Sequence, residues 1–435
     1  MRIADLNGKK ILMLGYGREG KAMEQAIKKH KVTCSFTVSE KYPDLQVMGM
    51  DIFGIYAGQR KYLDPLSSFD VIIKSPGIPP NEELESLGAK VTSSTQIFLD
   101  SIQNTGATVI GVTGSKGKST TSTLIYEILK AGDKDVSLVG NIGEPAISHM
   151  DEAKPGKFFV MEMSSYQLMN LQTSPHIAVI TSFFPEHLDY HGSLENYKNA
   201  KKNIAKYLEP QDAIFFNENS EGAIEIAQES KGERIPFSAD DCPIPIAETK
   251  LLGNHNRSNI AAAYAVGEHC GVSADVMQTV IRNFQGLPHR LQSLGMHHGI
   301  EWIDDAISTT PESTIAALDA LGDRVATIIL GGQDRGNDFT QLAQRIKQSS
   351  VKIVILFPGT GPRIQEALTQ ANVAATIKDA QSMEDAVNIA RKQTSTQKPG
   401  NQQPPIVLLS TASPSYNMFK NFEEKGERFR ECILR

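Results

Sequence analysis

The stretch Gly111-Val-Thr-Gly-Ser-Lys-Gly-Lys-Ser-Thr120 follows an apolar run and precedes an amphipathic one. Residues 107–112 are predicted to form a buried strand, and residues 119–130 are predicted to form a helix. Glycines between a strand and a helix let backbone N–H groups approach an anion, and the helix N-terminus adds partial positive charge. Lys118 adds a full charge, and the Ser119 hydroxyl is suited to bind Mg²⁺. The stretch therefore predicts a loop that binds nucleotide phosphates.

The spacing within this stretch departs from the general phosphate-loop pattern. That pattern, G-x-x-x-x-G-K-[ST], requires glycine at position 112, where this chain has Val112 with Gly111 beside it. The alternative is a plain glycine turn without a ligand. Gly114, Gly117 and Lys118 nevertheless stand together at a strand–helix junction, which favours phosphate binding.

Composition limits the class of protein. The chain has 435 residues, enough for about two to four domains. Its net charge of −6, without blocks of like charge, gives no electrostatic reason to expect nucleic-acid or membrane binding. No apolar run approaches the ~20 residues of a membrane span, and the four cysteines show no C-x-x-C spacing. We expect a cytoplasmic monomer in a reducing compartment.

The N-terminal segment carries a dinucleotide-binding fingerprint. An apolar strand over residues 9–14 leads into Gly15-Tyr-Gly17-Arg-Glu-Gly20 and an amphipathic helix that ends near residue 29. A second strand over residues 32–38 leads to Glu40, about where a ribose-binding acid stands in such folds. The pattern indicates a diphosphate site without identifying the nucleotide. A nicotinamide cofactor, another nucleotide and a Rossmann-like scaffold with an empty turn all remain open.

Strands alternate with helical patterns along the rest of the chain. This alternation predicts an α/β fold with mostly parallel sheets, whose ligands bind at the carboxyl ends of the strands. Further strands are expected at residues 69–74, 136–139, 158–161, 177–180, 213–216, 300–303, 326–330, 353–357 and 406–409. Residues 392–405 are predicted to form an exposed loop, and residues 416–434 an amphipathic helix.

We expect three domains. Residues 1–92 are predicted to form a Rossmann-like domain, and residues 93–293 a phosphate-loop ATPase-type domain with a parallel sheet. Residues 294–435 are predicted to form a second Rossmann-like domain. Gly286-Leu-Pro-His-Arg290 has the composition of a linker between the last two.

Four polar residues of the central segment are of types that can bind metals or take part in catalysis. Glu162 follows an apolar strand, where a carboxylate is a natural Mg²⁺ ligand, although a solvated or helix-capping acid is more common. His187 and His191 have a spacing that zinc sites use, but the sequence shows no glutamate between them and no third ligand. Lys201, by residue type alone, is an ordinary lysine of a charged helix.

Polar residues near the predicted linker have two interpretations each. Asn256 and Asn259 open an alanine-rich helix, where they either read an adenine edge or cap the helix. Arg290 is long enough to reach a phosphate. Asp305 ends a strand, where it either contacts a ribose, orders Arg290, or is simply a surface acid.

Over nearly its whole length the chain resembles the Mur ligases, ATP-dependent amide-forming enzymes of peptidoglycan precursor synthesis. The family's phosphate loop has the form G-x-T-G-[ST]-x-G-K-[ST]-[ST], which Gly111–Thr120 fits without the misfit noted above. Further family motifs match in order: Asn141-Ile-Gly143, Glu162-Met-Ser-Ser-Tyr-Gln167, His187-Leu-Asp189, His255-Asn256 with Asn259, Leu287-Pro-His-Arg290 and Asp305.

Within this family the chain looks most like the branch that adds D-glutamate to UDP-N-acetylmuramoyl-L-alanine. The grounds are Ser75-Pro-Gly77, Leu409-Ser-Thr-Ala-Ser-Pro-Ser415 and Phe419-Lys-Asn-Phe422. The resemblance implies ligation through an acyl phosphate, with ATP and two Mg²⁺ ions. It also implies that the N-terminal domain holds the UDP of the acceptor substrate.

The resemblance also implies roles for individual residues. Lys118, His187 and Lys201 would be catalytic, and Lys201 aligns with the family's carbamylated lysine. The metal ligands would be Ser119, Glu162, His187 and Lys201. The ATP contacts would be Gly114, Ser115, Lys116, Gly117, Lys118, Ser119, Thr120, Asn256, Asn259, Arg290 and Asp305. The UDP-substrate contacts would be Gly15, Tyr16, Gly17, Arg18, Ser75, Gly77, Asn141 and Ser164, and the glutamate contacts would be Thr309, Arg335, Ser415 and Phe422.

Two positions depart from the D-glutamate branch. Ile307 stands where that branch usually has a lysine, so a cationic contact is absent. Arg335 stands where lysine is frequent, and it keeps the charge while adding a bidentate grip on a carboxylate. A relative that adds L-glutamate is therefore the nearest alternative. A nicotinamide-dependent dehydrogenase and a nucleotide-gated binding module are alternatives from other classes, each favoured by one glycine-rich loop.

Overall fold

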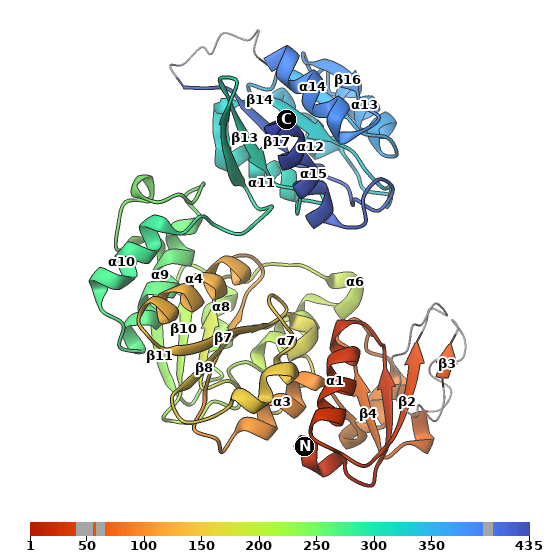
Figure 1. The fold of residues 1–435 in the computed structure, drawn as a ribbon, viewed down its shortest axis with the longest axis vertical. Coiled ribbons are helices and arrows are strands. Elements are labelled where there is room, and N and C mark those ends of the chain that lie inside the picture. The colour runs from red at the N-terminus through yellow and green to blue at the C-terminus, as the bar shows by residue number, and fades with distance from the viewer. Residues whose placement is uncertain (41–54, 58–65, 395–402) are drawn as a thin grey trace. The chain divides into compact units, whose positions relative to one another are not determined.

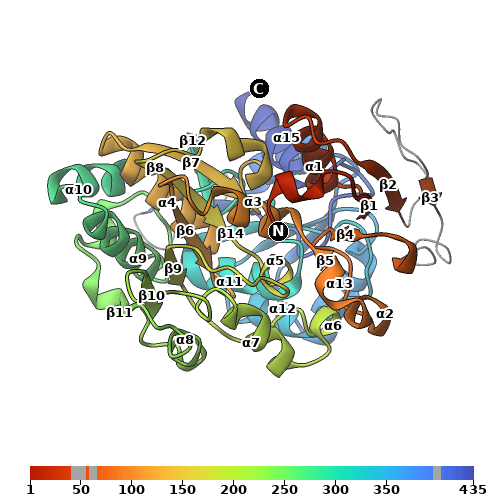
Figure 2. The same cartoon turned by 90° about the horizontal axis from the view of Figure 1, so that it is seen from below.

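The computed structural model describes residues 1–40, 55–57, 66–394 and 403–435. Within these ranges the chain forms three β-sheets covered by helices, which confirms the expected α/β class (Figures 1 and 2). The chain divides into two compact units. Unit 1 contains residues 1–248 and 255–283, and unit 2 contains residues 249–254 and 284–435. The boundaries of the three expected domains stay a prediction.

The first sheet of unit 1 is parallel, with strand order β3-β2-β1-β4-β5. Its strands are β1 (Lys10–Leu14), β2 (Ser35–Glu40), β3 (Ile55–Ala57), β4 (Val71–Lys74) and β5 (Val91–Thr92). The accompanying helices are α1 (Arg18–Lys29), α2 (Glu82–Ser86) and α3 (Ser94–Ile102). Because β1 and β4 are neighbours with connections leaving in opposite directions, the loops that follow them meet. The Ser75 hydroxyl donates to the Gly15 carbonyl oxygen at 2.7 Å.

The second sheet of unit 1 is also parallel, with strand order β11-β10-β9-β6-β8-β7. Its strands are β6 (Thr108–Thr113), β7 (Asp135–Gly140), β8 (Lys157–Glu162), β9 (Ile177–Ile180), β10 (Ala213–Asn217) and β11 (Glu233–Phe237). Its helices are α4 (Lys118–Ala131), α5 (Ser165–Leu168), α6 (Leu188–His191), α7 (Leu194–Lys202), α8 (Glu221–Ala227), α9 (Asn256–His269) and α10 (Ala274–Asn283). Strand β6 lies between β8 and β9, so the loop after β6 is flanked by the ends of both.

The sheet of unit 2 has strand order β12-β13-β17-β14-β15-β16; β12 pairs antiparallel with β13, and the other described pairs are parallel. Its strands are β12 (Gln292–His297), β13 (Ile300–Asp304), β14 (Val325–Leu330), β15 (Ile353–Leu356), β16 (Thr376–Asp379) and β17 (Ile406–Leu409). Its helices are α11 (Pro311–Leu321), α12 (Thr340–Lys347), α13 (Gly361–Gln370), α14 (Met383–Thr394) and α15 (Phe422–Leu434). Short 3₁₀ helices occupy Ile3–Leu6, Leu66–Ser68, Gly88–Lys90, Ala146–Glu152, Ala239–Asp241, Ile246–Glu248 and Gly322–Arg324.

The two sheets of unit 1 share one hydrophobic core. Ile11 from the first sheet and Val109 from the second belong to the same buried cluster, which Ile97 and Phe98 of α3 also join. The Phe98 ring packs edge-on against Phe159, with ring centroids 5.3 Å apart. Helix α3 therefore contributes to the core that the two sheets share, and its burial stabilises both.

Several sequence predictions need correction in detail. The C-terminal helix begins at Phe422 and not near residue 416, because the Asn421 side chain accepts from the Glu424 N–H and caps it. The predicted loop at 392–405 is helical up to Thr394, and residues 395–402 lie outside the described ranges. Edge strands β5, β11, β12 and β16 were not predicted, because they are short or only partly buried. None of the helices in the described ranges is long and apolar enough to span a bilayer.

Candidate active site

The loop between β6 and α4 requires glycine at two positions. Gly114 has φ +155°, and a Cβ there would lie 2.0 Å from the Thr181 hydroxyl oxygen. Gly117 has φ +87°, and a Cβ there would lie 2.3 Å from Oδ1 of Asn259. Gly117 is the N-cap of α4, and no side chain makes a capping hydrogen bond there. The first-turn N–H groups of α4 therefore have the arrangement that binds phosphate.

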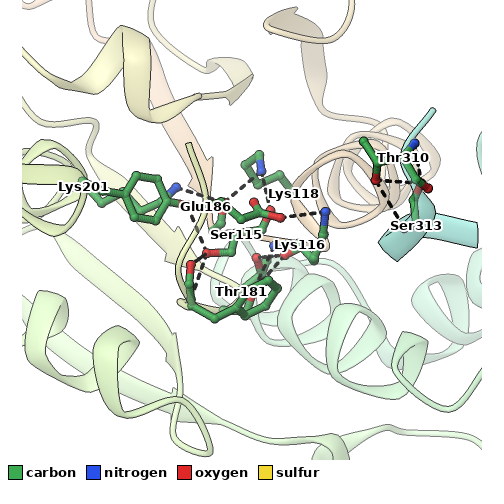
Figure 3. A network of polar contacts seen from close by, with 12 residues as sticks. Ser115, Lys116, Lys118, Thr181, Glu186, Lys201, Thr310 and Ser313 are labelled. Atoms are coloured by element: carbon green, nitrogen blue, oxygen red, sulfur yellow. Dashed lines mark hydrogen bonds and ion pairs between the residues drawn. The ribbon is translucent and has the colours of Figure 1, made fainter. Parts of the chain in front are cut away.

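The first half of this loop is anchored to the segment that follows β9 (Figure 3). The Ser115 hydroxyl donates to the Phe184 carbonyl at 2.8 Å, and the Lys116 ammonium pairs with Glu186 at 2.7 Å. The backbone N–H groups of Ser115 and Lys116 both donate to Ser182. Both residues were predicted to contact ATP. In this structure they hold the loop in place, and their contact with ATP stays a prediction.

Two lysine ammonium groups meet at one carbonyl oxygen in this site (Figure 3). The Lys118 Nζ donates to the Gly114 oxygen at 2.8 Å, and the Lys201 Nζ donates to the same oxygen at 2.9 Å. Lys201 is 1% exposed and also donates to the Thr113 hydroxyl at 3.1 Å. Burial, followed by repulsion from Lys118, lowers the pKa of Lys201 well below its usual value. Sequence reasoning alone gave Lys201 no special role.

Glu162 lies at the end of β8, directly beside β6 in the sheet. Its Oε1 accepts a hydrogen bond from the Asn141 side-chain amide at 2.7 Å. Its Oε2 is buried and has no hydrogen-bond partner among the described residues. A buried carboxylate oxygen without a partner is unfavourable, and a divalent cation is a suitable partner for it. The observation fits the predicted role of Glu162 as a metal ligand.

His187 lies immediately before α6, with φ +56°. Its ring lies 5.1 Å from that of Tyr166, centroid to centroid. Burial is the largest cause that lowers the pKa of His187, and the charges of Lys118 and Lys201 lower it further. This shift favours the neutral imidazole, the form in which histidine binds a metal.

His191 does not join His187 in a zinc site. Its side chain is buried, and its Nε2 lies 3.0 Å from the Ser165 hydroxyl. Within the described ranges, no three His, Cys, Asp or Glu side chains gather as a preformed metal cluster.

The predicted UDP-substrate residues gather around the loop after β1. Arg18 donates to the carbonyl oxygens of Gly140 at 2.9 Å, Asn141 at 3.0 Å and Gly143 at 3.3 Å, so it clasps the loop that precedes β8. The Tyr16 N–H donates to the Glu40 carboxylate at 2.7 Å. One backbone N–H donor of the glycine-rich turn is therefore already bonded to a carboxylate of the protein.

Two other predicted contacts have structural tasks. The Ser164 hydroxyl accepts from the Gln167 N–H at 3.3 Å and caps α5. Asn259 donates to Asn256 at 2.9 Å while its Oδ1 faces Gly117. The Asn259 side chain therefore supports the phosphate loop at Gly117.

In unit 2, Asp305 ends up buried at the carboxyl end of β13. It accepts hydrogen bonds from the Ser410 hydroxyl at 2.8 Å and the Leu291 N–H at 3.2 Å. Burial raises its pKa to about 6, and the nearby charge of Arg290 opposes that rise. The predicted ATP contacts thus fall on both units, with Asp305 and Arg290 on unit 2 and the phosphate loop on unit 1.

The predicted glutamate residues lie on unit 2. The Ser415 hydroxyl is buried without a hydrogen-bond partner in the described part of the chain, which suits a ligand contact. The Arg335 guanidinium lies 5.6 Å from the centroid of the Tyr416 ring. The Phe422 ring lies 6.2 Å from that of His289. Thr309 is half-buried, in the turn that precedes α11.

Sequence reasoning missed three residues around the site. Glu186 pairs with Lys116, while Lys74 and Tyr190 connect the loop after β4 to α6. The available signal was Lys74, a single charged residue at the end of the otherwise apolar β4. Because burying a charge is costly, a charged residue at the end of a buried strand beside a ligand-binding loop is a candidate functional residue.

The chain belongs to the Mur ligase family. Residues 112–244 match the Mur ligase middle domain, and residues 289–401 match the glutamate ligase domain of Mur ligases. The UDP-N-acetylmuramoylalanine–D-glutamate ligase of Streptococcus agalactiae serotype Ia is 34% identical, over 98% of this chain and 97% of that protein. The enzyme of the same name from Acetivibrio thermocellus is 33% identical, with the same coverage of both chains.

The fold is similar to that of solved Mur ligases. MurF ligase from Thermotoga maritima, solved in complex with ADP, matches with a TM-score of 0.56 at 14% identity. The match covers 99% of this chain and 96% of that chain. The sequence relatives, matched over 98% of this chain, argue against the alternative that the N-terminal fingerprint belongs to a dehydrogenase.

Proposed function

We propose that this chain is an ATP-dependent ligase that joins D-glutamate to UDP-N-acetylmuramoyl-L-alanine. The relatives that it matches over nearly their full length carry this activity in their names. The observation that carries the proposal chemically is the convergence of Lys118, Lys201 and Glu162 around the phosphate loop. The Lys118 ammonium, the Lys201 amine and a carboxylate oxygen without a partner in the described ranges form a site suited to phosphate and a divalent metal.

The side chains that would hold Mg²⁺ are Ser119, Glu162, His187 and Lys201, the last as a carbamate. The lowered pKa of Lys201 supports this modification, because only a neutral amine attacks CO₂. The ammonium would first lose one proton to give the neutral amine. The amine nitrogen would then bond to the CO₂ carbon and release a second proton, so that a cation becomes an anionic oxygen ligand. Two bound Mg²⁺ ions would offset the charge of the phosphates and the acceptor carboxylate.

The proposed reaction has two steps. The terminal alanine carboxylate of the acceptor attacks the γ-phosphorus of ATP, which releases ADP and yields an acyl phosphate. The glutamate amine then attacks the acyl carbon, phosphate leaves, and the amine proton passes to solvent or a base. Lys118 and the first-turn N–H groups of α4 would stabilise the transferring phosphoryl group by preorganised electrostatics. Arg335 and Ser415 would hold the incoming glutamate.

The finer assignments form part of the same proposal. The domains would comprise residues 1–92, 93–293 and 294–435, for the UDP-substrate, ATP and glutamate in that order. The protein would act as a cytoplasmic monomer on small molecules.

Ile307 favours a second candidate, addition of L-glutamate to the same acceptor. The D-glutamate branch usually has a lysine at this position, and a cationic contact with the amino acid is therefore missing. Which isomer is used depends on how the remaining contacts compensate.

One assay tests both candidates. ATP consumption is measured with UDP-N-acetylmuramoyl-L-alanine plus either D- or L-glutamate, and the amide product is identified by mass. Turnover that depends on D-glutamate supports the first candidate, and turnover only with L-glutamate supports the second. ATP consumption without amide product in either case would refute the ligase proposal.

A further inference from the structure

A buried lysine outside the assigned site is held only by uncharged groups of the described chain. Lys74 ends β4 and is 5% exposed. Its ammonium donates to the Ile78 carbonyl at 2.6 Å and to the Tyr190 hydroxyl at 3.3 Å, and it approaches the Ser75 carbonyl at 3.5 Å. Burial lowers its pKa to about 8. A cation is rarely buried in this way unless its position matters.

Tyr190 connects this lysine to the segment that carries His187. Its hydroxyl lies 2.6 Å from the Pro76 carbonyl and 2.7 Å from the Ile78 carbonyl. Tyr190 belongs to α6, the helix that begins directly after His187. Its ring lies 4.1 Å from that of Tyr166, which also contacts His187. The turn at residues 75–78, here named the 75–78 turn, is thus fastened to the segment that carries His187.

The 75–78 turn also touches the glycine-rich loop. The Ser75 hydroxyl donates to Gly15, and a Cβ at Gly15 would lie 2.9 Å from that of Ser75. A displacement of the turn would therefore move the wall of the predicted UDP site. A displacement of α6 would move the imidazole predicted to bind metal.

We propose that Lys74 and Tyr190 are positioning residues that hold the 75–78 turn and His187 in a fixed relative position, here called their register. The acceptor could then bind with its UDP end beside the turn and its carboxylate end beside His187. This inference rests on the proposed function, because it takes the acceptor to be a UDP-linked carboxylate that extends from the turn to the metal site. Neither residue contacts the reacting atoms. The pair acts through the groups it holds, and it matters more for a ligand that spans the two ends than for one that fills a single end.

The test compares a short ligand with a spanning ligand. Calorimetry measures the Kd of UDP and of UDP-N-acetylmuramoyl-L-alanine for the full chain and for Tyr190→Phe and Lys74→Met. The phenylalanine keeps the ring packing against Tyr166 and removes the hydroxyl. Tyr207→Phe and Lys231→Met are the matched controls, since neither residue lies in the site.

We expect each variant to weaken binding of the spanning ligand about 10-fold, the effect of losing one or two hydrogen bonds, while UDP affinity changes less than about threefold. The KM for ATP should stay within about twofold of wild type, because the phosphate loop is untouched. Equal losses for both ligands, or no loss for either, would overturn the register role. A wild-type protein that binds neither ligand would refute the proposed function and this inference with it. Wild-type ligation with variants that match wild type would refute the inference alone.

Discussion

Lys118 and Lys201 donate hydrogen bonds to the same oxygen atom, the carbonyl of Gly114, at 2.8 and 2.9 Å. Two ammonium groups at one acceptor repel each other, and Lys201 is the buried member of the pair. Burial, followed by the charge of Lys118, lowers the pKa of Lys201 well below its usual value. This shift favours the neutral amine of Lys201, the form that the proposed carbamate requires.

We expect Lys201→Ala to reduce ligation at least ~10³-fold, because it removes a proposed metal ligand. Small carboxylates such as acetate should restore part of the rate by occupying the place of the carbamate. Initial rates of ADP release with and without acetate provide the measurement. Lys206→Ala, on the exposed side of the same segment, is the control. Full activity of the Lys201 variant would contradict the metal role.

We expect Gly117→Ala to raise the KM for ATP at least ~10-fold, because the residue adopts φ +87° and its Cβ would push into Asn259. Gly156→Ala is a matched control, since Gly156 has φ +83° and a Cβ added there would meet no described atom within 4 Å. The control should lose only about 1–2 kcal/mol of stability from left-handed backbone strain and keep its KM. Steady-state kinetics and urea unfolding separate the two effects. An unchanged KM in the Gly117 variant would contradict the role of the loop.

Asp305 gives a prediction for stability against pH. Its pKa is raised from 3.8 to about 6 in the folded state, so this group stabilises the fold fully below pH 3.8 and loses that contribution as pH rises through about 6. Asp305→Asn removes the titration. Relative to wild type, the variant should gain about 1–2 kcal/mol between pH 5 and pH 7.5 in urea unfolding. Asp323→Asn, at an exposed position, should show no such trend, and a pH-independent difference for Asp305→Asn would contradict the burial argument.

The missing cation at position 307 gives a prediction for specificity. Ile307→Lys should lower the KM for D-glutamate about 10-fold, because a lysine ammonium can pair with a glutamate carboxylate. The kcat/KM values for D- and L-glutamate, measured side by side in wild type and variant, provide the test. Ala316→Lys, at an exposed position of α11, controls for the added charge alone. A loss of D-glutamate activity would show that the pocket is built differently around Ile307.

The backbone of the site could be predicted from local pattern, whereas its side-chain partnerships could not. The spacing of Gly114, Gly117 and Lys118 was enough to predict a phosphate loop. The structure contains the strand, loop and helix expected around these residues. The burial of Lys201 depends on how α7 packs against the loop after β6. No pattern local to residue 201 contains that information.

Other features were missed for related reasons. One hydrogen-bond partner of Lys74, Tyr190, lies 116 residues further along the chain, and another, the Ile78 carbonyl, lies in the turn that follows Lys74. The edge strand β12 alternates weakly in burial and contains an irregular register between Ser293 and Met296, so its pattern was not distinctive. The engagement of Ser115 and Lys116 with Ser182 likewise follows from tertiary contact, because the phosphate-loop motif describes only the residues within it.

The hydrophobic cluster that runs through α3, with Phe98 against Phe159, bears on how such a protein can diverge. Recombination that exchanged residues 1–92 with those of a distant relative would leave mismatched packing on both sides of this helix. The parts proposed to recognise the acceptor and to bind phosphate should therefore be inherited together. Unit 2 has its own cores, so under the proposed function the choice of amino acid is the trait most free to change by exchange.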